Sequence, residues 1–164
     1  MKKMIICLFL TFALSGIVPL KSQELSVREE IDYINSLLKA NPYKDTFLEI
    51  TFYYSIDVTP DSELVVYMDF DGPFKTIMKA NMKKLDNTIQ IDTALEGTSS
   101  ICWNCNYDKV TGQNNCVYSE KIDKGGDKES HFGNNICVMV TRQSDIRDKL
   151  INAFRVLFKK FPDQ

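Results

Sequence analysis

The sequence has few of the residues that usually carry catalysis, and it has no excess of positive charge. His131 is the single histidine, so any Ser-His-Asp or Cys-His arrangement would have to include it. Nothing near it is typical of a nucleophile motif, and we expect an exposed side chain without a catalytic role. Lysine and arginine number 20 against 22 acidic residues, for a formal charge of −2. This balance excludes the basic surface that binds nucleic acid or an anionic membrane.

Long apolar runs are also missing, with one exception at the N-terminus. Lys2 and Lys3 precede an apolar stretch at residues 4–18, and polar residues follow at 21–23. This is the layout of a secretory signal peptide, and the stretch is short for a membrane span. A retained N-terminal anchor is the alternative. We predict a signal peptide at residues 1–22 and one domain at 23–164, periplasmic or secreted, with no membrane span after cleavage.

Four of the five cysteines lie outside this leader, an even number that suits disulfide bonding in an oxidising compartment. Cys102, Cys105, Cys116 and Cys137 allow three pairings. Residues three apart on a strand face opposite sides, so Cys102 and Cys105 should have different partners. Cys105 and Cys116 flank the polar segment 108–113 almost symmetrically. We therefore favour Cys105 with Cys116 and Cys102 with Cys137.

The C-x-x-C motif formed by Cys102 and Cys105 also admits thiol redox or zinc binding as an alternative function. Redox motifs of this kind lie at the start of a helix, where the thiol pKa is lowered, whereas this one is predicted in a strand. A zinc site would need all four cysteines as thiolates in a compartment that favours disulfides. Structural disulfides are the preferred interpretation, and we expect no metal and no cofactor.

Hydrophobic periodicity predicts an α+β domain. Ser26 and Glu29 form a capping box that starts a helix with an apolar stripe, and Asn41-Pro42 ends that helix. The period then changes from 3.6 to two, the mark of half-buried strands. Seven strands are predicted, at residues 48–58, 63–70, 74–81, 88–94, 99–107, 115–120 and 136–141.

The connections and the C-terminus carry further expectations. The fifth and sixth strands should pair directly as a hairpin around the 108–113 loop. The polar segment 121–134 is expected to be a mobile loop. Ser144 is expected to cap a final amphipathic helix, which ends at Pro162.

This order of elements resembles the pleckstrin-homology-like superfold. The resemblance implies a bent antiparallel sheet or barrel packed by the C-terminal helix, with the N-terminal helix as an addition. Another antiparallel sheet packed by two helices is the alternative. The apolar N-terminus, the helix with Asp32-Tyr33-Ile34-Asn35 and the closing segment 149–154 also resemble small uncharacterised exported proteins of Gram-negative bacteria. That resemblance implies export and no assigned activity.

The strand at 63–70 leads into Asp69-Phe70-Asp71-Gly72, which is similar to the first motif of haloacid dehalogenase phosphatases. The resemblance implies Asp69 as nucleophile and Asp71 as acid/base, with magnesium between them. Pro73 departs from the family pattern, and a strand follows where a helix should. A hairpin turn is therefore the preferred interpretation.

Strand alternation places some aromatic side chains outward, and these define a possible ligand face: Tyr53, Tyr67, Trp103 and Tyr107. Outward aromatics on a sheet can form a binding surface. The alternative, which we favour, is that the N-terminal helix covers them. In the absence of a complete catalytic motif, the sequence predicts a binding or interaction module for an unknown protein or small ligand rather than an enzyme.

Overall fold

The structure is a computed structural model that describes residues 26–92, 98–106, 114–141 and 143–161. The predicted signal peptide at 1–22 lies outside the described residues. The elements in order are α1 (Val27–Ala40), β1 (Tyr43–Asp45), β2 (Ile50–Val58), β3 (Glu63–Phe70), β4 (Phe74–Asn81), a 3-10 turn η1 (Met82–Lys84), β5 (Gln90–Asp92), β6 (Thr98–Asn104), β7 (Val117–Asp123), β8 (Lys128–Gly133), β9 (Asn135–Thr141) and α2 (Ser144–Lys159). None of the described helices is long and apolar enough to cross a membrane.

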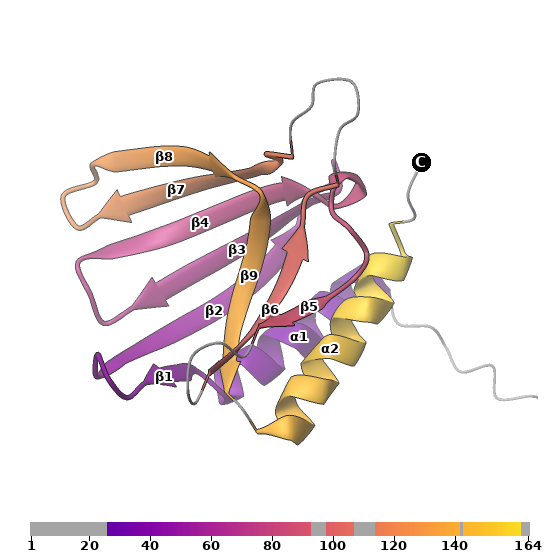
Figure 1. Cartoon of the computed structure of the whole chain (residues 1–164), viewed down its shortest axis with the longest axis horizontal. Helices are drawn as coiled ribbons and strands as arrows, with labels where there is room; N and C mark the ends of the chain where they lie inside the picture. The colour runs from indigo at the N-terminus through magenta and orange to yellow at the C-terminus, as the bar shows by residue number, and fades with distance from the viewer. Residues whose placement is uncertain (1–25, 93–97, 107–113, 142, 162–164) are drawn as a thin grey trace, which may run out of the picture.

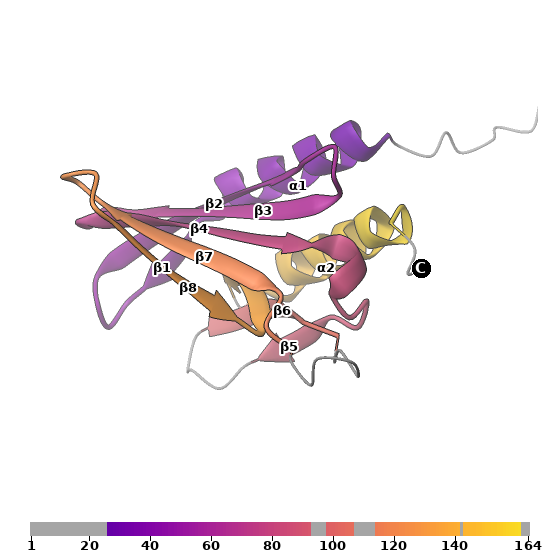
Figure 2. The same cartoon turned by 90° about the horizontal axis from the view of Figure 1, so that it is seen from above.

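The strands form two antiparallel sheets, which confirms the α+β class. Six strands pair in the order β1-β2-β3-β4-β7-β8, and three pair in the order β5-β6-β9. β9 crosses over the larger sheet in Figure 1. The helix α1 packs against β2 and against α2, and α2 also contacts β9 (Figure 2). The described strands number nine rather than the expected seven. They do not close into a barrel, so the barrel implied by the pleckstrin-homology-like resemblance is not formed.

The first helix begins and ends where the sequence predicts. The Ser26 hydroxyl accepts from the Glu29 amide at 3.2 Å, and the Glu29 carboxylate accepts from the Ser26 amide at 2.7 Å. This capping box satisfies two amides that the helix itself leaves without partners. At the other end the Asn41 side chain donates to the Leu37 carbonyl at 2.9 Å.

Trp103 is the largest of the fully buried side chains. Its ring packs edge-on against Phe154 and stacks on Phe158, with centroids 4.6 and 5.2 Å apart. Both phenylalanines come from α2, so this contact joins the smaller sheet to the helix. The expectation that Trp103 belongs to an outward ligand face is wrong, because both faces of β6 are covered.

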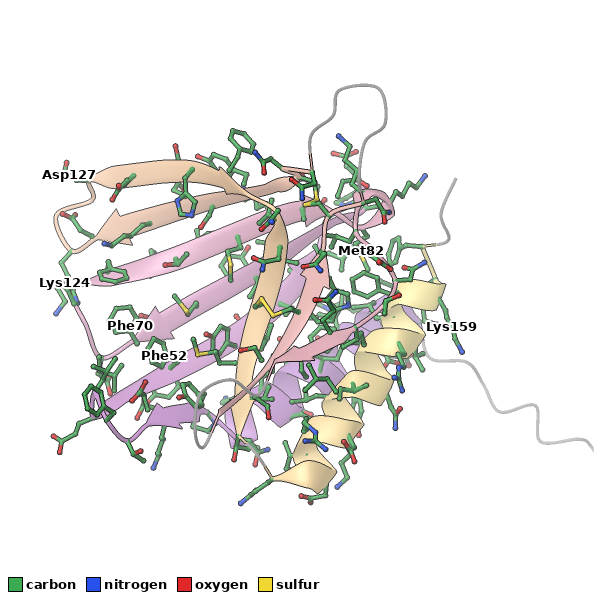
Figure 3. The ribbon with its side chains drawn as sticks, viewed as in Figure 1. Phe52, Phe70, Met82, Lys124, Asp127 and Lys159 are labelled. Carbon is green, nitrogen blue, oxygen red and sulfur yellow. A yellow bond between two sulfur atoms is a disulfide. The ribbon has the colours of Figure 1, made fainter. Side chains whose placement is uncertain are left out.

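A second aromatic cluster packs the far end of the larger sheet. The rings of Phe52 and Phe70 lie 5.3 Å apart on neighbouring strands (Figure 3), and Phe70 meets Phe74 edge-on at 4.6 Å. The Lys121 ammonium lies 4.0 Å from the centroid of the Phe74 ring. Such pairs add to the burial of apolar area in fixing the register of β2, β3 and β4.

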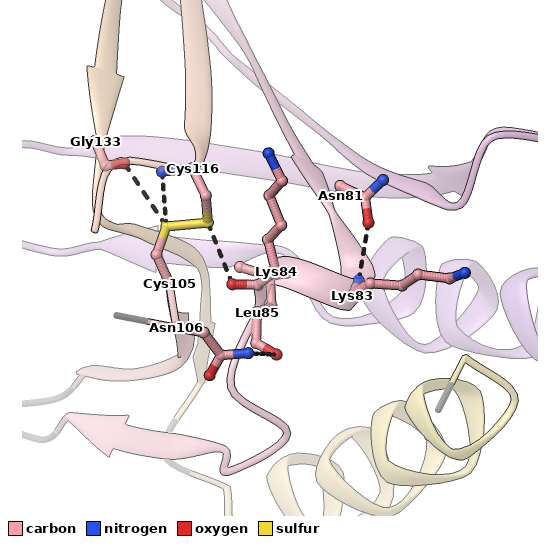
Figure 4. The surroundings of a disulfide bond; sticks show 8 residues. All are labelled: Asn81, Lys83, Lys84, Leu85, Cys105, Asn106, Cys116 and Gly133. Atoms are coloured by element: carbon pink, nitrogen blue, oxygen red, sulfur yellow. Dashed lines mark hydrogen bonds between the residues drawn. A yellow bond between two sulfur atoms is a disulfide. The ribbon is translucent and has the colours of Figure 1, made fainter. Parts of the chain in front are cut away.

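The disulfides have the predicted pairing. Cys102 and Cys137 lie directly opposite each other on β6 and β9, with Cα atoms 4.2 Å apart. Cys105 and Cys116 join the end of β6 to the start of β7, with Cα atoms 5.6 Å apart (Figure 4). The predicted hairpin between these strands is wrong, because β6 pairs with β5 and β9 while β7 pairs with β4 and β8. The second bridge therefore links the two sheets.

Two other expectations are corrected. The polar segment after residue 120 is not a mobile loop: it forms most of the β7–β8 hairpin, with Lys124 and Asp127 at its tip in Figure 3. The last helix starts at Ser144 with Gln143 as its N-cap residue, whose side chain makes no capping hydrogen bond. Capping by Ser144 is therefore wrong by one position.

Candidate functional site

A groove of about 550 Å³ lies between the C-terminal half of α1 and the outer face of β2, β3 and β4. Successive residues of a strand face opposite sides. The residues that face outward here alternate with core residues such as Ile56 and Val66. The groove is lined by residues of α1 and of the three strands: Asn35, Leu38, Lys39, Tyr53, Tyr54, Ser55, Tyr67, Met68, Asp69, Lys75, Thr76 and Ile77.

Two tyrosines dominate the floor of the groove. The register of β2 and β3 sets Ser55 opposite Tyr67 and Tyr53 opposite Asp69. Tyr53 and Tyr67 are therefore diagonal neighbours, a spacing within reach of aromatic side chains. Their exposed fractions are 47 % and 42 %. This pair forms an aromatic surface with room for a ligand above it.

The wall of the groove is set by Asn35 of α1. Its side-chain amide donates to the Ile56 carbonyl at 2.9 Å and accepts from the Ile56 amide at 2.8 Å. Further along, Arg28 lies 3.6 Å from Asp57 of the same strand. These contacts hold α1 beside the edge of β2, so the helix borders Tyr53 instead of covering it. The favoured expectation of a helix that buries the outward tyrosines is wrong for Tyr53 and Tyr67.

The polar groups at the groove are few and carry both signs. Lys39 and Lys75 bring two ammonium groups, and Asp69 brings one carboxylate. One oxygen of Asp69 already accepts from the Phe70 amide at 2.8 Å. The groove thus combines an apolar and aromatic floor with a small excess of positive charge, an arrangement suited to binding.

The Asp69-Phe70-Asp71-Gly72 motif lies at the groove's end as a turn. The Gly72 amide donates to the Phe70 carbonyl at 2.6 Å, and β4 begins directly after Pro73. A side chain at position 72 would overlap the Phe70 ring, which is why glycine stands there. The strand–turn–strand context confirms the predicted hairpin and lacks the helix that the phosphatase motif requires.

The other predicted residues lie away from the groove. Cys102 and Cys105 are bonded to different partners, so the C-x-x-C pair does not form a disulfide of its own. His131 is exposed on β8, opposite Ser119. Tyr107 lies outside the described residues. Among the described residues there is no group of three or more histidines, cysteines and acids placed to hold a metal ion.

Some of the groove residues are predictable from strand alternation in the sequence, and others are not. Tyr53 and Tyr67 were predicted from alternation alone. Lys75 and Ile77 alternate in the same way on β4 and could have been added to the face. Asn35 and Lys39 give no such signal, because their place depends on where α1 packs. Comparison of the chain with family models, with curated proteins and with solved structures finds no match.

Proposed function

We propose that the protein is an exported, disulfide-stabilised binding module that holds a small anionic ligand with an aromatic or apolar body in the groove. The observation that carries this proposal is the pair of half-exposed tyrosines, Tyr53 and Tyr67, on the floor of a groove that two lysines border. Adjacent exposed aromatic side chains form a contiguous apolar patch, and such patches mark binding sites on protein surfaces.

The size and chemistry of the groove support a small ligand. Its volume of about 550 Å³ falls within the range of about 300–1,000 Å³ common for small-molecule sites. The tyrosine rings offer stacking surface, and the amines of Lys39 and Lys75 favour a carboxylate, sulfonate or phosphate on the ligand. Asp69 selects against a second anionic group close to it.

Export is supported by the cysteines. All four that follow the predicted leader are in disulfides, which persist in oxidising compartments. The proposed mature protein is a single domain at residues 23–164, in the periplasm or outside the cell, and belongs with the small exported proteins that the sequence resembles. We propose no catalytic activity and no cofactor.

The test uses 8-anilinonaphthalene-1-sulfonate, a fluorescent probe with aromatic rings and one sulfonate. Titration into the protein should give saturable binding with enhanced emission. Tyr53→Ala and Tyr67→Ala should each weaken binding by about fivefold, because an aromatic contact contributes on the order of 1 kcal/mol beyond burial. Lys75→Glu should weaken it as well.

The matched control is Phe132→Ala, which removes an exposed ring from β8 on the same face of the sheet but outside the groove. It should leave the affinity for the probe unchanged. Equal affinities in the wild type and both tyrosine variants would show that the groove is not the binding site.

A further inference from the structure

The strand β8 ends the larger sheet and has no neighbouring strand on its outer side among the described residues. Figure 1 shows it as the outermost ribbon. Five of its six residues are exposed, and Phe132 among them has an exposed fraction of 68 %. An unpaired strand edge offers a row of backbone donors and acceptors to another strand.

The hydrogen bonds of the hairpin show which residues face outward. The Asp123 amide donates to the Asp127 carbonyl at 3.0 Å. Hydrogen-bonded and non-bonded pairs alternate along an antiparallel ladder, so Glu129 and His131 also direct their backbone groups toward β7. It follows that the backbone groups of the alternate residues point away from the sheet: Lys128, Ser130 and Phe132.

Two other contacts agree with this assignment. The Lys124 amide donates to the Pro73 carbonyl at 2.9 Å, on the β4 side of β7, as the alternation requires. The Asn134 carbonyl, which continues the outward series on β8, accepts from the Cys105 amide at 2.7 Å. Among the described residues, the covered part of the edge therefore begins at Asn134, and the three earlier outward residues remain uncovered.

We propose that two copies of this chain pair antiparallel along β8, with Ser130 on the twofold axis, and so join their larger sheets into one. In this register Ser130 faces its own copy, and the two serines exchange both backbone hydrogen bonds. Lys128 of each copy pairs in the same way with Phe132 of the other. All three outward residues are then satisfied in both chains.

The side chains of β8 are complementary to a second copy in this register. Glu129 lies opposite His131 of the second copy on one face, and the pair recurs symmetrically. On the other face the Lys128 stem lies against the exposed Phe132 ring of the second copy, a lysine–aromatic contact. The twofold axis keeps the two Lys128 ammonium groups at opposite ends of the paired strands. Each ammonium group lies 3.2 Å from the carboxylate of Glu120 in its own chain. No like charges face each other, which favours a second copy over an arbitrary strand.

Cysteine cross-linking tests the register directly. The chain is produced by export in a Cys7→Ser background, so that no other thiol competes. Ser130→Cys places two thiols across the axis with Cα atoms about 5.5 Å apart, within disulfide reach. Lys128→Cys places them about 14 Å apart, four residues out of register, and is the matched control. We expect oxidation to give a covalent dimer with Ser130→Cys and none with Lys128→Cys, while a mixture of Lys128→Cys and Phe132→Cys cross-links.

Sedimentation of the protein without added cysteines tests the association itself. Twice the monomer mass should be reached at protein concentrations up to about 1 mM, since short edge interfaces are weak. Ser130→Pro should be monomeric, because it removes an outward amide while the bonds to β7 remain, whereas Ser130→Thr should still dimerise. A monomeric wild type, or a Ser130→Pro variant that dimerises equally, overturns the proposal. If the wild type is a monomer, the outer edge of β8 would instead be a site for an extended segment of another protein.

Discussion

Asn35 of α1 holds the main chain of Ile56 on β2 through both ends of its side-chain amide, at 2.9 and 2.8 Å. β1 pairs with β2 only as far as Phe52, so beyond that point no strand among the described residues borders the edge of β2. The asparagine amide presents one donor and one acceptor, as a strand residue would. One side chain therefore completes the sheet edge and also fixes the wall of the groove.

Replacement of Asn35 by alanine should lower the free energy of unfolding by about 2–3 kcal/mol, because two hydrogen bonds are lost and a partly buried backbone pair is left unsatisfied. Urea denaturation followed by circular dichroism measures this. Ser36→Ala, one residue along on the exposed side of the same helix, should change stability by less than about 0.5 kcal/mol. Equal midpoints for the two variants would mean that water replaces the asparagine without cost.

Substitutions of Trp103 should depend strongly on the size of the replacement. Alanine should cost about 3–5 kcal/mol, the range for a large aromatic core residue. Phenylalanine should cost only about 1–2 kcal/mol, because the indole Nε1 has no hydrogen-bond partner in the described structure and its loss removes a buried unsatisfied donor. Thermal and urea unfolding of the two variants decide this. Similar losses for both would indicate that the indole nitrogen has a partner after all.

The elements that the sequence predicted well are those whose signal is local. The strands at 63–70 and 74–81 have the predicted bounds, because apolar alternation and the turn at Asp71-Gly72 both lie within a few residues. The Ser26–Glu29 capping box is local in the same way. The disulfide pairing was also predicted correctly, although the hairpin used to justify Cys105–Cys116 does not exist.

The strands that the sequence did not predict show no alternation of apolar and polar residues. β8 is exposed on both faces, so polar residues fill both sets of positions and the segment has the composition of a loop. β1 has only three residues, which is too short for a periodic signal. The pairing of β6 with β9 joins distant parts of the chain, and periodicity contains no information on partners.

The candidate site shows the same division. Alternation placed Tyr53 and Tyr67 outward correctly because residues 53–56 of β2 and 67–70 of β3 alternate between an exposed and a more buried face. Alternation failed for Trp103 because β6 is covered on both faces. The three consecutive residues Ile101, Cys102 and Trp103 are all buried. The position of α1, which makes the groove from the open face, depends on the Asn35–Ile56 contact and could not be read from spacing.

Removal of either disulfide should destabilise the protein, and the two losses should differ. The Cys102–Cys137 bridge closes a loop with a sequence separation of 35, against 11 for Cys105–Cys116. Loop-closure entropy predicts losses of about 4 and about 3 kcal/mol for the paired serine variants. Urea unfolding of each double variant measures them. A larger loss on removing Cys105–Cys116 would indicate that its link between the two sheets matters more than the length of the loop it closes.

Neighbouring glutamates of α1 should respond to pH with opposite signs. Burial raises the pKa of Glu30 above its ordinary value of 4.5, and the Lys160 charge offsets this only in part. The folded state therefore holds that proton more tightly than the unfolded state, and this contribution to stability is present at low pH and lost as pH rises through the folded pKa. Glu30→Gln should stabilise the protein at neutral pH, with an advantage that disappears below pH 4.5.

Glu29 is the internal control, one residue away. Its hydrogen bonds to Ser26, the backbone amide first and the side chain second, lower its pKa. Its contribution is therefore present above the ordinary pKa and lost as pH falls through the folded value. Glu29→Gln should destabilise the protein at neutral pH, and the difference from the wild type should shrink in acid. Urea midpoints from pH 3 to pH 7 compare the two variants with the wild type. If Glu30→Gln and Glu29→Gln both destabilise the protein at neutral pH, burial does not penalise the ionised form of Glu30. Water, rather than α1 and α2, would then surround its carboxylate.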